Sequence, residues 1–105
     1  MNEIGLILKK TEEFGRWYSS LRDTEQTRVD ARLDHMTAGY FGCSRSLGDG
    51  LFELKWNNGM RVYFSRKKIK DIDTIVLWGG FKGTQKADIS KARKLKARYE
   101  YEFKK

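Results

Sequence analysis

The segment from residue 51 to residue 66 contains the side chains best suited to chemistry on a phosphate, in the sequence LFELKWNNGMRVYFSR. Asn58 and Gly59 form a dipeptide typical of a β-hairpin turn, because both residues tolerate a positive φ. Alternation along the second strand of this hairpin places Arg61 and Tyr63 on one face. We expect that face to be exposed, so that the guanidinium binds two oxygens of one phosphate and the ring of Tyr63 or Trp56 stacks on a base.

The same hairpin allows a second interpretation, which strand periodicity does not distinguish from the first. Arg61 would pair with Glu53 across the two strands, and Tyr63 would lie half-buried beneath the last helix. In both interpretations Met60, Val62 and Phe64 point into the core.

A glycine-rich loop followed by a helix provides a second candidate for binding an anion, in the sequence WGGFKGTQKAD. Backbone N–H groups at the start of a helix attract negative charge, and Lys82 and Lys86 strengthen that attraction. The GxxxxGK[ST] pattern of a nucleotide-binding P-loop is absent.

Other reactive residue types are sparse. His35 is the only histidine and Cys43 the only cysteine, and their separation does not indicate a nucleophile paired with a base. No metal-binding pattern is present, so we expect neither a metal nor another cofactor.

Charge is distributed unevenly along the 105 residues. Residues 1–52 hold seven basic and eight acidic residues, for a net charge of −1, whereas residues 53–105 hold fifteen and six, for +9. A one-sided basic surface is typical of proteins that bind nucleic acid. An acidic protein partner and a merely solvated basic face remain the alternatives.

Length and composition indicate one domain with one modest hydrophobic core. The N-terminus lacks the pattern of a signal peptide, and no stretch approaches the about 18 apolar residues of a membrane-spanning helix. With a single cysteine there is no intrachain disulfide. We therefore expect a cytoplasmic protein without a membrane partner.

The spacing of apolar residues predicts two N-terminal helices that form an antiparallel hairpin. Thr11 is expected to cap the first helix, and Asp23 or Thr24 to begin the second, which ends at Gly39. The expected inward-facing side chains of the two helices are Phe14, Trp17, Tyr18, Leu21, Val29, Leu33 and Met36.

Strands and a C-terminal helix are predicted for the remaining segments. The expected strands are Glu3–Lys9, Phe41–Leu47, Leu51–Trp56, Met60–Ser65 and Asp73–Gly79, and Thr84 caps a helix that runs to about Arg98. Gly79 and Gly80 are expected to end the last strand. The sequence thus predicts an α+β domain over residues 1–105 with the order βααββββα, in which a small antiparallel sheet is packed by the helical hairpin and the last helix.

Five segments in this order carry a family resemblance: TEEFGRWYSSLRD, ARLDHMTAGYFG, SLGDGLFELKW, GMRVYF and VLWGGFKGTQKADISKA. Together they cover about residues 3–98, and the chain resembles the RelE/ParE toxin superfamily, in particular its HigB-like "addiction module killer" branch. The resemblance implies the toxin of a type II toxin–antitoxin system, neutralised by a cognate antitoxin, of helix-turn-helix type, that is encoded beside it. Members typically cleave mRNA in the ribosomal A site without a metal: the 2′-hydroxyl attacks its neighbouring phosphate.

The resemblance also implies roles for individual residues. It assigns the family's strand arginine to Arg61, the basic residue before the last helix to Lys82, and a basic strand residue to Lys55. Asp88 stands where several mRNA-cleaving members carry Tyr or His and is a candidate for proton transfer, whereas Glu53 occupies a position that is often basic. The expected contacts to ribosomal RNA or mRNA are Tyr63, Arg66, Lys67, Lys68 and Lys86.

Two other functions remain open under this resemblance. The ParE branch inhibits DNA gyrase without enzymatic chemistry, and a degenerate relative would only bind nucleic acid or an antitoxin.

Overall fold

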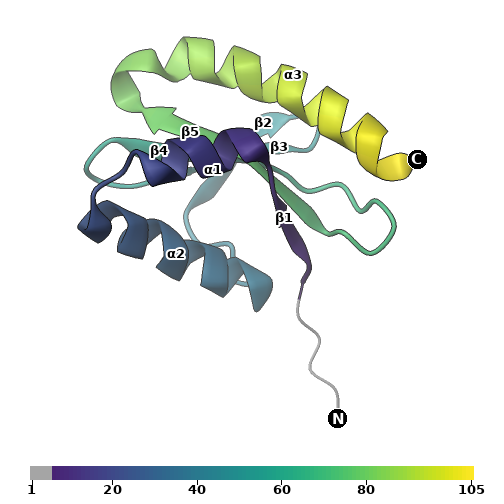
Figure 1. Cartoon of the computed structure of the whole chain (residues 1–105), viewed down its shortest axis with the longest axis horizontal. Helices are drawn as coiled ribbons and strands as arrows, with labels where there is room; N and C mark the ends of the chain where they lie inside the picture. Colours follow the sequence, from purple (N-terminus) through teal and green to yellow (C-terminus); the bar gives the residue numbers. More distant parts are fainter. Residues whose placement is uncertain (1–5) are drawn as a thin grey trace.

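The computed structural model describes residues 6–105, which form one five-stranded sheet with helices on both faces (Figure 1). The elements follow in the order β1 (Leu8–Lys10), α1 (Glu12–Ser19), α2 (Asp23–Thr37), β2 (Ser44–Gly48), β3 (Leu51–Lys55), β4 (Met60–Ser65), β5 (Thr74–Phe81) and α3 (Gln85–Lys104). A 3₁₀ turn over Lys82–Thr84 precedes α3. The α+β class and the order of elements are therefore as predicted.

The sheet is mixed, which corrects the prediction of an antiparallel sheet. Its strand order is β1-β5-β4-β3-β2, in which β2 to β5 form an antiparallel meander and β1 pairs in parallel with β5. The meander leaves one side of β5 open, and β1 pairs there; the connection from β1 to β2, which contains α1 and α2, leads to the opposite edge of the sheet. Strand direction of this kind depends on the long connection, so residue alternation does not reveal it.

The first strand is shorter than predicted, although the part at positions 3–5 lies outside the described residues. The register joins Leu8 to Thr74 and Lys10 to Val76. Just beyond β1 the hydroxyl of Thr11 donates to the carbonyl of Leu77 and accepts from Phe14 N–H at 3.0 Å. Thr11 therefore caps α1, as predicted, and fixes that helix to β5.

One hydrophobic cluster lies between the sheet and the helices α1 and α2. Its buried members are Phe14, Leu21, Val29, Leu33, Met36, Leu54, Met60, Val62, Phe64 and Val76. The inward positions predicted for both helices are confirmed, except that Trp17 and Tyr18 are only half-buried. Gly39, with φ +93°, follows the end of α2.

A second cluster fills the opposite face beneath α3. It contains Leu51, Tyr63, Ile69, Ile75, Leu77, Ala92, Leu95 and Tyr99. The sheet is thus buried on both sides, and Figure 1 shows α3 lying along it on the side away from α2.

Helix α3 extends beyond the predicted end near Arg98 because its last turns make specific contacts. Tyr99 donates its hydroxyl to Glu13 of α1 at 2.6 Å, and Arg98 pairs with the same carboxylate at 3.0 Å. Ser65 of β4 donates to Glu100 at 2.5 Å. These contacts hold the C-terminal half of α3 against both α1 and the sheet.

The prediction that Gly79 and Gly80 end β5 is wrong, because both lie inside the strand. A Cβ at Gly79 would come within 2.5 Å of the Trp17 ring, and one at Gly80 would collide with the carboxylate of Asp88. These glycines allow a helix on each face to approach the strand closely.

The β3–β4 hairpin forms as predicted. Gly59 has φ +94°, and the side-chain oxygen of Asn58 accepts from Met60 N–H at 3.1 Å. Among residues 6–105, no helix is both long and apolar enough to cross a membrane.

Candidate phosphate-binding site

Arg61 and Tyr63 share the face of β4 that lies beneath α3, so the prediction of an exposed face is wrong. The exposed fraction is 8% for Arg61 and 0% for Tyr63. The predicted alternation is correct, but α3 covers the face that it creates. The structure corresponds to the second interpretation of the hairpin, with Tyr63 buried more deeply than expected. Stacking of a base on Tyr63 has no accessible surface in this conformation.

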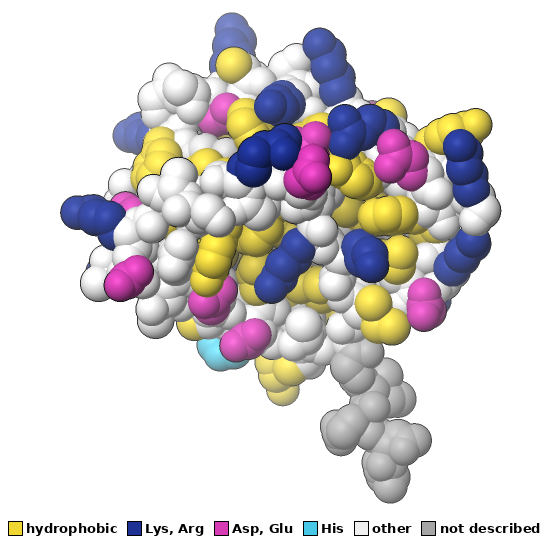
Figure 2. Space-filling view, in the orientation of Figure 1, with side chains coloured by type: hydrophobic (Ala, Val, Ile, Leu, Met, Phe, Trp, Pro, Cys, Tyr) yellow, Lys and Arg dark blue, Asp and Glu magenta, His cyan; other side chains and the backbone are white. Residues whose placement is uncertain are grey.

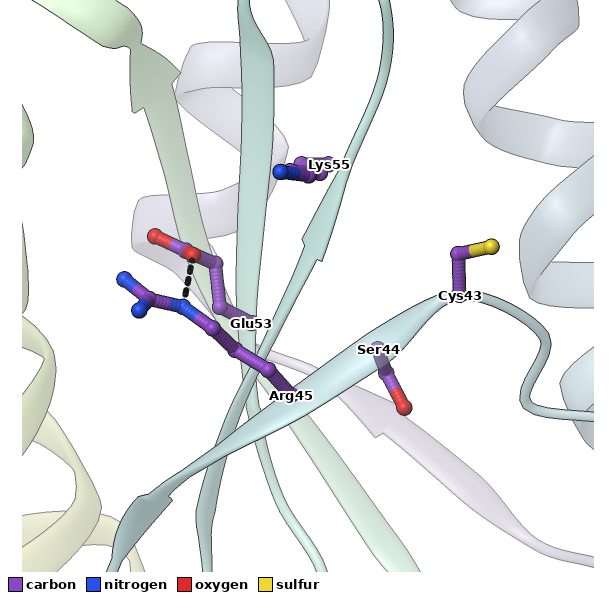
Figure 3. Close-up of a pocket in the computed structure, with 5 residues that line it drawn as sticks. All are labelled: Cys43, Ser44, Arg45, Glu53 and Lys55. Atoms are coloured by element: carbon purple, nitrogen blue, oxygen red, sulfur yellow. Dashed lines mark hydrogen bonds and ion pairs between the residues drawn. The ribbon is translucent and has the colours of Figure 1, made fainter.

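The carboxylate of Glu53 is the centre of a buried set of polar side chains, the Glu53 group, whose other members are Arg45, Arg61, Tyr63 and Gln85. It accepts from Arg45 Nε at 2.9 Å and from Gln85 Nε2 at 2.9 Å, and Arg61 Nε lies 3.9 Å away. Figure 3 shows the side chains of Arg45 and Glu53 pointing toward one another from neighbouring strands. The side chain of Glu53 is only 1% exposed. Three elements, β2, β4 and α3, therefore direct donors at one buried carboxylate.

Two donors beside Glu53 have no hydrogen-bond partner among the described residues, namely Arg61 Nε and the Tyr63 hydroxyl. Burial, followed by the negative charge of Glu53, raises the pKa of Tyr63, so its hydroxyl stays protonated. A buried donor without an acceptor costs free energy, roughly 1–3 kcal/mol. Both donors are themselves buried, so they reach a ligand oxygen only when the side chains around them move.

Asp88 lies at the start of α3 against Gly80. It is 5% exposed and accepts from the Thr84 hydroxyl at 2.6 Å. Because Gly80 is the register partner of Arg61, the first turn of α3 is held directly over the Arg61 end of the sheet. Asp88 is therefore close to the group centred on Glu53, while its own carboxylate takes part in the turn that begins α3.

Lys55 and Lys82 lie at the exposed margin of this group. Lys55 is the register partner of Arg61, and such partners have Cβ atoms about 4.5–5.5 Å apart. The stem of Lys82 packs beside Gly59 at the hairpin turn. The sheet register therefore brings Lys55, Arg61 and Lys82, three of the four predicted catalytic residues, to the same end of the sheet.

A pocket of about 290 Å³ opens next to Lys55 (Figure 3). It is lined by Cys43, Ser44, Arg45, Glu53 and Lys55. Asp88 is not among these lining residues. The pocket therefore reaches the buried carboxylate of Glu53 from the side of β2, between two basic side chains.

The basic segment after β4 lies at the other end of that strand, about 16 Å along it from Arg61. The guanidinium carbon of Arg66 lies 3.9 Å from the centroid of the Phe41 ring, and the ammonium of Lys68 pairs with the carboxylate of Asp73 at 3.2 Å. Lys67 is exposed beside them. These three predicted nucleic-acid contacts are thus remote from the Glu53 group.

Lys86 is exposed on the first turn of α3 and lies near the Lys82 end of the sheet. Figure 2 shows further Lys and Arg side chains over α3, with acidic side chains interspersed. Trp56, the other aromatic of the hairpin, is half-buried beneath the Arg32 guanidinium, which lies 4.9 Å from its ring centroid.

Sequence analysis paired Glu53 with Arg61 in its second interpretation but did not identify two other members of the site, Arg45 and Gln85. Alternation places Glu53 directly across from Tyr63, and that signal supported the pairing with Arg61. The role of Arg45 follows from the β2–β3 register, in which it faces Glu53. Gln85 has no such signal, because its contact joins positions 32 residues apart.

Comparison with known proteins identifies one relevant relative. No model of a known protein family matches the sequence. A Haemophilus influenzae protein described as "Uncharacterized protein" is 36% identical over 91 residues, which are 84% of this chain and 90% of the relative. Such identity over nearly the full length of both chains indicates common descent and a common fold.

Proposed function

We propose that this chain, which belongs to the same family as the Haemophilus influenzae protein, is a toxin that stops translation by cleaving mRNA on the ribosome. The observation that carries the proposal is the convergence of Lys55, Arg61 and Lys82 at one end of the sheet, beside a buried carboxylate. The resemblance to the HigB-like branch of the RelE/ParE superfamily supports the same function. A cognate antitoxin encoded by the adjacent gene would neutralise the protein.

In the proposed reaction the 2′-hydroxyl oxygen of one nucleotide attacks the phosphorus atom on its 3′ side. The bond from phosphorus to the 5′-oxygen of the next nucleotide breaks, which leaves a 2′,3′-cyclic phosphate and a 5′-hydroxyl. Charge accumulates on the non-bridging oxygens in the transition state, and Lys55, Arg61 and Lys82 stabilise it there. Arg61 Nε has no hydrogen-bond partner among the described residues, and it would donate to such an oxygen once the buried side chains around it move aside.

Proton transfer in this reaction requires a base for the 2′-hydroxyl and an acid for the leaving oxygen. Glu53 and Asp88 are the two carboxylates near Arg61. Because Glu53 lines the pocket and Asp88 does not, we assign the base to Glu53 in preference to Asp88. The ammonium group of Lys55, which lines the same pocket, protonates the leaving 5′-oxygen.

A bacterial translation extract tests the proposal directly. Reversal of both exposed charges, Lys55→Glu with Lys82→Glu, is expected to reduce mRNA cleavage on ribosomes about 100-fold or more, because two transition-state contacts are lost. The control Lys9→Glu with Arg28→Glu makes the same change in net charge at exposed positions of β1 and α2 and is expected to cleave normally. Equal cleavage by both variants would overturn the proposal.

The burial of Arg61 favours one second function, in which the protein binds a partner without cutting RNA. An arginine that is 8% exposed and faces a carboxylate is also what a structural ion pair requires. A ParE-type inhibitor of DNA gyrase and a relative that only binds nucleic acid or an antitoxin both fit this arrangement. Normal translation together with broken or relaxed plasmid DNA would identify the gyrase inhibitor. Absence of both effects would leave only binding.

A further inference from the structure

A groove between α1 and α3 contains an aromatic surface that the proposed phosphate site does not use. It has a volume of about 270 Å³ and is lined by Glu13, Arg16, Trp17, Trp78 and Lys91. Trp17 comes from α1 and Trp78 from β5, so the groove lies where these elements meet α3. Phe81 extends the aromatic surface, since its ring centroid is 6.2 Å from that of Trp17 and the residue is 40% exposed.

The position of the two indole rings is fixed by their surroundings. Trp17 lies against the backbone of β5 at Gly79, where any side chain would collide with it. Trp78 donates its indole N–H to the carbonyl of Asp88 at 3.1 Å. The aromatic surface is therefore preformed, which reduces the entropy lost when a planar ligand binds.

The charges around the groove favour an anionic ligand. The ammonium of Lys91 lies 4.4 Å from the centroid of the Trp78 ring, and the side chain of Arg16 is 65% exposed. Arg16 pairs with Glu12 at 3.0 Å, but an exposed pair of this kind is weak and releases the guanidinium readily. The groove thus combines flat aromatic rings with two cations, of which Lys91 has to leave the Trp78 ring before a base stacks on that ring.

Glu13 is the one acidic side chain that lines the groove, and its charge is already neutralised. Its carboxylate accepts from Tyr99 at 2.6 Å and pairs with Arg98 at 3.0 Å. An incoming phosphate therefore meets Arg16 and Lys91, and the carboxylate that it has to displace is the exposed Glu12 paired with Arg16.

We propose that this groove binds one nucleobase of a single-stranded RNA, with the flanking phosphates held by Arg16 and Lys91. Stacking on aromatic side chains combined with basic residues along the backbone is the usual way in which proteins hold single strands. Trp78 is two residues from Gly80, the register partner of Arg61, which is about 7 Å along the strand. From the groove, the bound RNA continues to Lys82 and the Arg61 end of the sheet. The inference therefore rests on the proposed function, because it takes this RNA to be the substrate.

Binding of a free oligonucleotide, measured by fluorescence anisotropy, tests the groove apart from cleavage. The probe is a single-stranded RNA of about six nucleotides with 2′-O-methyl groups, which block attack by the 2′-oxygen. Phe81→Ala and Arg16→Ala are each expected to raise its Kd roughly tenfold. Tyr101→Ala removes an aromatic side chain that is 66% exposed, more than Phe81, from the far end of α3 and is expected to leave the Kd unchanged.

An abasic sugar, placed at each position of the probe in turn, identifies the stacked base. We expect one position at which loss of the base weakens binding to the unmodified protein about tenfold and has little further effect on Phe81→Ala. An equal Kd at every abasic position would mean that only phosphates are bound, and would overturn the inference. Arg16→Ala changes an exposed side chain and keeps the test valid if Phe81→Ala does not fold.

Two further outcomes separate this inference from its alternatives. If the groove variants bind RNA normally but lose a co-purifying protein partner, the groove is a protein interface and the inference fails. If the unmodified protein leaves mRNA intact on ribosomes, the proposed function fails, while the oligonucleotide assay still decides whether the groove holds a base.

Discussion

Replacement of Glu53 by glutamine is expected to lower the free energy of unfolding by about 3 kcal/mol. The substitution preserves the size of the side chain and removes its charge. Arg45 and Gln85 each donate to one oxygen of the carboxylate, whereas an amide has a single acceptor oxygen. One donor therefore faces the amide NH₂ group, and Arg61 loses its counter-charge.

The magnitude follows from the burial of each partner. Loss of a buried hydrogen bond to a charged group costs about 1.5–3 kcal/mol. The side chain of Arg45 is 59% exposed, so its ion pair contributes only about 0.2–1 kcal/mol. The side chain of Arg61 is 10% exposed, and its Nε lies 3.9 Å from the carboxylate of Glu53. The free energy lost when Arg61 loses this counter-charge is therefore smaller than the about 3–5 kcal/mol of a closely paired buried charge. For a domain of this size, 3 kcal/mol corresponds to a fall in Tm of roughly 12–24 °C.

Urea denaturation followed by circular dichroism measures this change. The double variant Glu53→Leu with Arg61→Met supplies the control, because it leaves no buried ion unpaired; Arg45, the other cation paired with Glu53, is 59% exposed and is solvated by water instead. Its destabilisation is expected to be smaller than the sum of the two single changes. A Glu53→Gln protein within about 0.5 kcal/mol of the original would refute the view that this carboxylate organises the buried group.

Further predictions concern the helices around the site. Burial alone would raise the pKa of Glu13, but the hydrogen bond from Tyr99 and the charge of Arg98 lower that pKa overall. The ionised Glu13 therefore stabilises the fold fully at pH values above 4.5, the ordinary pKa of glutamate. This stabilisation is lost as the pH falls through the lower pKa of the folded protein. Glu13→Gln should therefore flatten the acid side of a stability–pH profile measured by thermal melting. Tyr99→Phe should cost about 1–2 kcal/mol in urea denaturation, since it removes the hydroxyl bound to Glu13. Gly79→Ala should lower stability by about 1–3 kcal/mol and alter the near-ultraviolet signal of Trp17, whereas Gly15→Ala, in open space on α1, should raise stability by up to about 1 kcal/mol.

The order of elements could be predicted because each is encoded by local patterns. The 3.6-residue spacing of Val29, Leu33 and Met36 and the two-residue alternation of Met60, Val62 and Phe64 both report which side faces the core. The end of α3 could not be predicted in this way. Its last turns are held by Glu13 and by Ser65, which are 86 and 35 residues from their partners.

The composition of the candidate site was predicted only in part, because Arg45 and Gln85 were not identified, and its exposure was predicted wrongly. Alternation correctly grouped Arg61 with Tyr63, and the register confirmed Glu53 as their neighbour. Whether that face meets solvent depends on the docking of α3, which is a long-range property of the fold. Gly80 was interpreted as a strand end for the same reason, because the need for a small residue there arises only when Asp88 packs against it.

The arrangement around Arg61 determines what an RNA phosphate must displace. Glu53 already places two carboxylate oxygens where donors from three elements converge, so it occupies the position of an anion within the site. In the proposed reaction, a phosphate that enters from the pocket beside Lys55 competes with this carboxylate for Arg45, which lines the same pocket, and the freed carboxylate accepts the proton of the 2′-hydroxyl. Under that proposal, the carboxylate that closes the site in the free protein becomes the base when substrate binds.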